Sequence, residues 1–110
     1  MSFEKFDLES LNKERLKAIA KTIHTINLDE VKNLGEQLFP HANDPWREAF
    51  FGFLKENPGS TYHHATTSDG VNLVYCRDKD KGIWFVPGSG LGILQARGRD
   101  VMKKMIEGNL

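Results

Sequence analysis

The sequence of 110 residues contains one cysteine, Cys76, and this scarcity limits the chemistry open to the chain. A lone cysteine excludes an intramolecular disulfide, a zinc finger built on several cysteines and an iron–sulfur cluster. The first residues are mixed and acidic, without the basic and then apolar pattern of a secretory signal. A thiol without a disulfide framework suits a reducing compartment, so we expect a cytoplasmic protein.

Net charge and long apolar runs are also absent. Fifteen Lys and Arg balance fifteen Asp and Glu, so the chain has no strong electrostatic field that would attract it to nucleic acid or to an anionic membrane. No apolar run approaches the roughly 18 residues that span a bilayer. The length fits one domain, residues 1–110, whose core needs neither disulfides nor metals. We therefore expect a soluble domain without a cofactor, which binds neither nucleic acid nor membrane.

Apolar residues recur at helical spacing in the N-terminal half of the chain. This spacing predicts helices over about residues 8–26, 28–38 and 45–56. Asn27 or Asp29 is suited to cap the second helix, because a short polar side chain accepts bonds from free N–H groups. Asp44 followed by Pro45 is a typical start for the third helix.

After residue 59 the sequence becomes rich in β-branched and aromatic residues, which favour strands. Three strands are predicted, over about residues 60–67, 71–77 and 82–87, followed by a helix over about 94–107. The Asp69-Gly70 pair between the first two strands is a strong hairpin signal. The predicted fold is α+β: a helical N-terminal half, a three-stranded antiparallel meander and a C-terminal helix.

Both faces of the second and third predicted strands are apolar. In the second strand, Leu73 and Tyr75 alternate with Val74 and Cys76. A sheet with one face in water should instead alternate apolar and polar residues. Either helices cover both faces, or one face is buried by a second copy of the chain or another partner; the pattern leaves both interpretations open.

A glycine-rich segment lies between the last predicted strand and the last helix: Gly88, Ser89, Gly90 and Gly92. Glycine N–H groups beside a helix N-terminus can bind an anion, which Arg97 or Arg99 could then clamp. The spacing matches neither the dinucleotide motif nor the phosphate loop of nucleotide hydrolases. We therefore favour the interpretation that this segment is a tight turn, which requires glycine because glycine is small and readily adopts positive φ.

The histidines near the hairpin suggest a second candidate site. A two-residue turn at Asp69-Gly70 places His63 opposite Cys76, and a slip of one residue places His64 there instead. Trp84 is expected on the other side of the thiol. A Cys–His pair is the minimum for thiolate chemistry, but apolar neighbours favour a buried, inert cysteine. Adjacent histidines on a strand point to opposite faces, so no metal site is expected.

The leading hypothesis for function is a small non-enzymatic binding or interaction module. It would use the aromatic sheet face, which includes Trp84, together with the Gly88–Gly92 loop. Its partner would be an unidentified protein or a second copy of the chain in a homodimer. The apolar residues on both faces of the predicted sheet motivate this hypothesis.

The alternative is a small enzyme or sensor that binds a phosphate- or carboxylate-bearing metabolite at the Gly88–Gly92 loop. Backbone N–H groups would bind this anionic ligand, and Arg97 or Arg99 would supply positive charge. His63 or His64 would transfer a proton. The alternative requires all of these groups to meet in one pocket.

Overall fold

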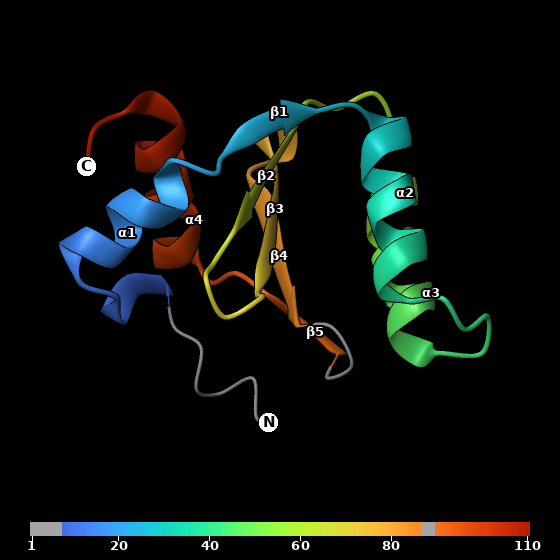
Figure 1. Ribbon diagram of the computed structural model, residues 1–110. Helices are drawn as coiled ribbons and strands as arrows, with labels where there is room; N and C mark the ends of the chain where they lie inside the picture. The colour runs from blue at the N-terminus through green and yellow to red at the C-terminus, as the bar shows by residue number, and fades with distance from the viewer. Residues whose placement is uncertain (1–7, 87–89) are drawn as a thin grey trace.

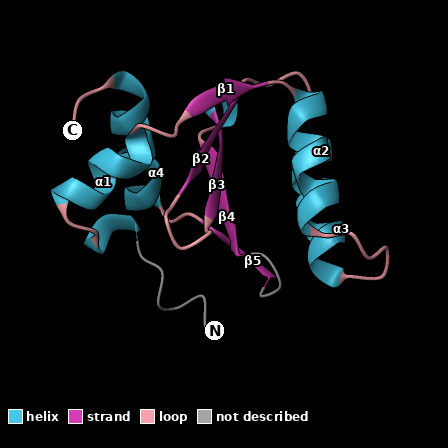
Figure 2. Cartoon of the chain, viewed as in Figure 1, coloured by secondary structure: helices cyan, strands magenta, loops and turns pink. Residues whose placement is uncertain are grey.

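Residues 8–86 and 90–110 are described by the computed structural model, and they form a sheet with helices on both faces (Figures 1 and 2). The helices are α1 (Lys13–Ala20), α2 (Leu28–Leu38), α3 (Pro45–Glu56) and α4 (Ala96–Glu107), with short 3-10 turns at Leu8–Ser10 and Arg77–Lys79. The strands are β1 (His24–Ile26), β2 (Tyr62–Thr66), β3 (Asn72–Cys76), β4 (Lys81–Val86) and β5 (Gly90–Ile93). All neighbouring strands are antiparallel, in the order β1-β2-β3-β4-β5.

Local capping explains where α2 and α3 begin. The side chain of Asn27 accepts a hydrogen bond from the Glu30 N–H, and the Glu30 carboxylate accepts one from the Asn27 N–H, which completes a capping box. Asp44 accepts a bond from the Trp46 N–H, and Pro45 occupies the first turn of α3. Of the two candidates for α2, Asn27 is therefore the cap, and the predicted start of α3 is confirmed.

The single helix predicted over residues 8–26 is wrong: this segment holds a 3-10 turn, α1 and β1. The Thr22 hydroxyl donates to the Ile19 carbonyl and accepts from the Thr66 N–H, which joins the end of α1 to β2. Residues 22–26 include two threonines and two isoleucines, and β-branched residues pack well in a sheet. Pairing with β2 therefore overrides the helical spacing of the apolar residues.

The sheet has five strands rather than the predicted three. β2, β3 and most of β4 fall inside the predicted strand ranges, whereas β1 and β5 were not expected. The interpretation of the glycine-rich segment as a strand-to-helix turn is wrong over Gly90–Ile93, because these residues pair with β4. The N-cap of α4 is Gln95, two residues after β5 ends.

The register of the β2–β3 hairpin differs from both expected registers. Tyr62, and not a histidine, lies opposite Cys76. The Thr67 N–H donates to the Val71 carbonyl, so the loop has three residues, with Gly70 at φ +87° in its last position. The expected pairing of a histidine with the thiol is therefore wrong.

Trp84 is also on the other face from the thiol. It lies opposite Leu73 and packs on the α1 and α4 side, whereas Cys76 is buried on the α2 and α3 side. This separation follows from the alternation of side chains along β3 and β4. The expected contact between Trp84 and Cys76 is therefore wrong.

Helices cover both faces of the sheet, the first of the two arrangements left open by the sequence (Figure 2). On the α1 and α4 side the buried core includes Leu73, Tyr75, Trp84, Leu94 and Met102. On the α2 and α3 side the rings of Phe39, Phe50 and Phe85 lie with centroids 5.3–6.0 Å apart. Such tilted and edge-on aromatic contacts stabilise a core beyond the effect of the area they bury.

Candidate functional site

The two described glycines of the predicted anion loop have structural roles in β5. Gly90 has φ +108°, a backbone conformation that other residues rarely adopt. Gly92 lies opposite Trp84, and a Cβ atom at Gly92 would collide with Cζ2 of the indole ring. Small residues at these positions therefore leave room for the backbone turn and for Trp84. Gly88 and Ser89, also predicted at this site, lie outside the described residues.

The two predicted arginines differ in their surroundings. Arg97 is exposed in the first turn of α4. Arg99 is half-buried, and its Nη1 donates to the carbonyl of Leu94 at 3.4 Å, just beyond β5. Its buried Nε has no hydrogen-bond partner among the described residues. Of the pair, Arg99 is thus the one that the structure holds near the end of β5.

His63 and His64 point to opposite faces of β2, as their adjacency predicts. His63 is buried on the α1 and α4 side, with Nδ1 3.4 Å from Oγ1 of Thr25, and burial lowers its pKa. His64 lies on the other side, where burial likewise lowers its pKa. Neighbouring strands are about 4.8 Å apart, so β2 and β5 are separated by about 14 Å. The described residues therefore do not bring a histidine to the glycine segment.

β5 is an edge strand, and it lacks the devices that commonly protect such edges. It pairs with β4 on one side, and the sheet order places no described strand on the other. Its sequence, Gly-Leu-Gly-Ile, contains no charge and no proline, and its pairing with β4 is regular. Edge strands are usually protected from further pairing by charged residues, prolines or bulges, because their unpaired N–H and C=O groups can bind another strand.

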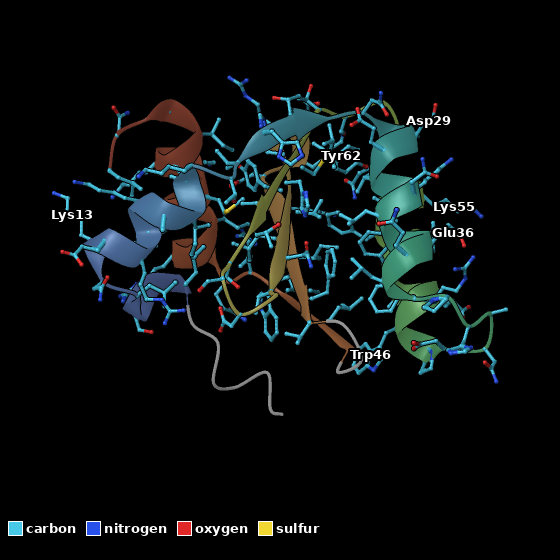
Figure 3. All side chains as sticks on the ribbon, in the orientation of Figure 1. Lys13, Asp29, Glu36, Trp46, Lys55 and Tyr62 are labelled. Carbon is cyan, nitrogen blue, oxygen red and sulfur yellow. The ribbon has the colours of Figure 1, made fainter. Side chains whose placement is uncertain are left out.

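Exposed apolar side chains flank this edge. Ile93 is 65% exposed and Trp46 is 41% exposed, and they are the large exposed apolar residues of the described chain. α3, which carries Trp46, packs against β5, and Figure 3 shows Trp46 at the end of α3 nearest β5. We call Gly90–Ile93 together with Trp46 the β5 edge. Sequence reasoning missed Trp46 and Ile93, because exposure depends on which helix covers which strand.

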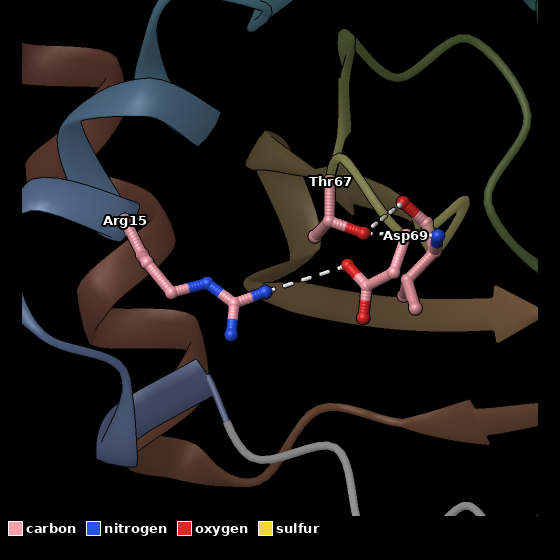
Figure 4. A network of polar contacts seen from close by, with 4 residues as sticks. Arg15, Thr67 and Asp69 are labelled. Carbon is pink, nitrogen blue, oxygen red and sulfur yellow. Dashed lines mark hydrogen bonds and ion pairs between the residues drawn. The ribbon is translucent and has the colours of Figure 1, made fainter.

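A cavity of about 280 Å³ lies between α1 and the β2–β3 turn, and several of its polar side chains are engaged in contacts within the protein. Arg15 forms an ion pair with Asp69 at 3.5 Å (Figure 4). The Thr67 hydroxyl accepts a bond from the Val71 N–H at 3.0 Å. Thr22 is bonded to β2 in the same region. This cavity gives no indication of a ligand.

A second cavity, of about 200 Å³, lies between the end of β3 and α4 and is lined by Tyr75, Arg77, Lys103, Ile106 and Glu107. At its side the Tyr75 hydroxyl donates to the Asp80 carboxylate at 2.7 Å, and the Lys103 ammonium lies 3.1 Å from the same oxygen. These two hydrogen bonds hold the pKa of Asp80 below its ordinary value. Arg77 is an exposed cation at this cavity.

Comparisons with protein-family models, with curated proteins and with solved structures found no match to this chain. In the described part of the chain, no helix has the length and apolar character needed to cross a membrane.

Proposed function

We propose that the protein is a small non-enzymatic interaction module that binds an extended protein segment along the β5 edge. The observation that carries this proposal is an uncharged, proline-free edge strand with an apolar side chain, Ile93, that is 65% exposed. Addition of a strand to a sheet edge is a recurrent mode of peptide recognition. This proposal retains the glycine segment of the leading hypothesis but replaces the sheet face, which helices cover, with the sheet edge.

The expected affinity follows from what the β5 edge can bury. Full burial of an apolar side chain contributes about 1.5–3 kcal/mol, so the exposed parts of Ile93 (65%) and Trp46 (41%) together contribute about 1.5–3 kcal/mol. Main-chain hydrogen bonds along the four residues of β5 add about 0.5–1.5 kcal/mol each, and association itself has an entropy cost, so we expect binding weaker than the micromolar affinity that requires about 8 kcal/mol. A short edge strand is therefore suited to a reversible interaction.

The test compares two edge strands of the same sheet. A peptide selected from a displayed random library against the wild-type protein would be titrated into it, with backbone amide NMR shifts as the readout. We expect the shifts to concentrate in Gly90–Ile93 and around Trp46, and to disappear in Ile93→Lys. Thr25→Lys, which places the same charge on the exposed edge strand β1, is the matched control and should leave binding unchanged.

The partner can also be a second copy of the chain, which would pair β5 with β5 about a twofold axis. Sedimentation of the wild type over a range of concentrations distinguishes this case, since dimerisation should be lost in Ile93→Lys. Peptides whose shifts lie elsewhere, combined with a monomer at every concentration, would refute the proposal.

A second candidate function is the binding of a phosphate- or carboxylate-bearing metabolite. The observation that favours it is the 200 Å³ cavity, where Arg77 is an exposed cation beside Tyr75, while Lys103 is paired with Asp80 and Glu107 also lines the cavity. We expect phosphate to raise the melting temperature of the wild type and of Arg97→Ala, but not of Arg77→Ala. An equal rise in all three proteins would contradict a site at this cavity.

A further inference from the structure

A histidine pair lies at the opposite edge of the sheet from β5. His24 of β1 is directly opposite His64 of β2, and both side chains lie on the α2 side. Their ring centroids are 5.2 Å apart and the ring planes are inclined by 74°. Sequence reasoning did not find this pair, because 39 intervening residues separate two histidines that only strand pairing brings together.

Both histidines line a groove of about 220 Å³ between the β1–β2 edge and α2. Its lining combines the two imidazoles with one carboxylate, two carboxamides and two apolar side chains: His24, His64, Glu30, Asn33, Gln37, Ile26 and Leu34. His24 is exposed and His64 is half-buried, so an ion can reach the pair from solvent. We call this depression the histidine groove.

Hydrogen bonding assigns the proton on His24. Its Nδ1 lies 2.9 Å from the carbonyl oxygen of Thr22. A carbonyl oxygen only accepts hydrogen bonds, so Nδ1 carries the hydrogen and donates it. The neutral ring then has its lone pair on Nε2, which has no hydrogen-bond partner among the described residues.

The proton on His64 is assigned in the same way. Its Nε2 lies 2.8 Å from Oδ1 of Asn72. The amide of Asn72 is itself oriented, because its Nδ2 donates to the Gly70 carbonyl at 3.3 Å. Oδ1 therefore accepts from Nε2 of His64, and the lone pair of the neutral ring lies on Nδ1.

This arrangement matches the requirements of metal-binding histidines. Such histidines almost always donate their second ring N–H to an oxygen acceptor, which fixes the orientation of the ring. A tetrahedral ion with metal–nitrogen distances of about 2.0–2.1 Å would hold the two ring centres about 5.2 Å apart. The observed separation of the His24 and His64 centroids is 5.2 Å.

We propose that the histidine groove binds a divalent transition-metal ion through Nε2 of His24 and Nδ1 of His64. The described residues contain no group of three or more His, Cys, Asp or Glu side chains arranged to hold a metal. The remaining coordination positions therefore belong to water, and the site is open rather than closed. Imidazole ligands select Cu²⁺, Ni²⁺ and Zn²⁺ over Mg²⁺ and Ca²⁺, which prefer oxygen. This proposal does not depend on the β5 edge.

The first test is calorimetric titration of the protein with NiCl₂ and ZnCl₂, with MgCl₂ as the negative control. We expect saturable binding of one ion per chain in the wild type. His24→Ala should weaken binding at least about tenfold, because it removes one of two protein ligands. His41→Ala removes an exposed histidine from the loop before α3 and is the matched control, with binding unchanged.

His24 is exposed, so its substitution leaves the core intact. Paramagnetic broadening of backbone amides by Ni²⁺ then locates the ion without any variant. We expect broadening around His24, His64 and the facing turns of α2, and none around His41. Asn72→Ser should weaken binding about 10–100-fold by freeing the ring of His64. Equal binding by His24→Ala and the wild type, or broadening centred elsewhere, would overturn the proposal.

Discussion

Replacing Gly35 with alanine tests the packing that holds α2 against α3. Alanine in place of glycine in a helix interior normally stabilises by about 1 kcal/mol. At Gly35, however, the new Cβ atom would lie 2.5 and 2.7 Å from Cε1 and Cδ1 of Phe50, and 2.9 Å from Cζ of Phe51. Phe50 is fully buried, so its ring has no open space into which to move.

The expected magnitude follows from these two opposing effects. Overpacking of a core typically costs about 1–3 kcal/mol, and contacts this short with two rings belong in the upper part of that range. After the gain in helix propensity, Gly35→Ala should lower the free energy of unfolding by about 1–2 kcal/mol. In a domain of this size, that change lowers the melting temperature by about 4–9 °C.

Gly52 in α3 provides the matched control. It is also inside a helix, but a Cβ atom there would have nothing within 4 Å. Gly52→Ala should therefore raise the melting temperature by about 4 °C, opposite in sign to Gly35→Ala. Thermal unfolding followed by circular dichroism measures both variants. If Gly35→Ala raised the melting temperature by a similar amount, the close packing of α2 on α3 would be refuted. The position of α2, which forms one wall of the histidine groove, would then also be wrong.

The remaining predictions concern titration, a buried hydroxyl and a surface ion pair. Burial lowers the pKa values of His63 and His64 in the folded state, so the unfolded chain binds more protons below its histidine pKa of about 6.5. Urea unfolding should therefore show lower stability at pH 5.5 than at pH 7.5, and an increase at pH 5.5 would contradict this assignment. Tyr62 donates to the Asn57 carbonyl at 2.6 Å and burial raises its pKa to about 12, so Tyr62→Phe should cost about 1–2 kcal/mol in thermal unfolding. Arg15→Ala should change stability by less than about 0.5 kcal/mol, because its ion pair with Asp69 is solvent-exposed, and a larger loss would show that this contact orders α1.

Local sequence determined the elements whose ends are set by their own residues. The capping box at Asn27 and the Asp44-Pro45 start define α2 and α3 because each satisfies free N–H groups within one turn. β2, β3 and β4 follow from β-branched and aromatic runs, which favour an extended backbone wherever they pack. The α+β class follows from these elements, and it is confirmed.

Only the tertiary structure decided the features that depend on a distant partner. Residues 24–26 continue a helical pattern, yet pairing with β2 makes them a strand. A three-residue loop ending at Gly70, rather than a two-residue turn, sets a register that puts Tyr62 opposite the thiol. The exposure of Ile93 and the meeting of His24 with His64 likewise depend on strand order. The β5 edge and the histidine groove therefore both lie at edges of the sheet, where long-range pairing rather than local propensity determines which groups meet and which remain open to solvent.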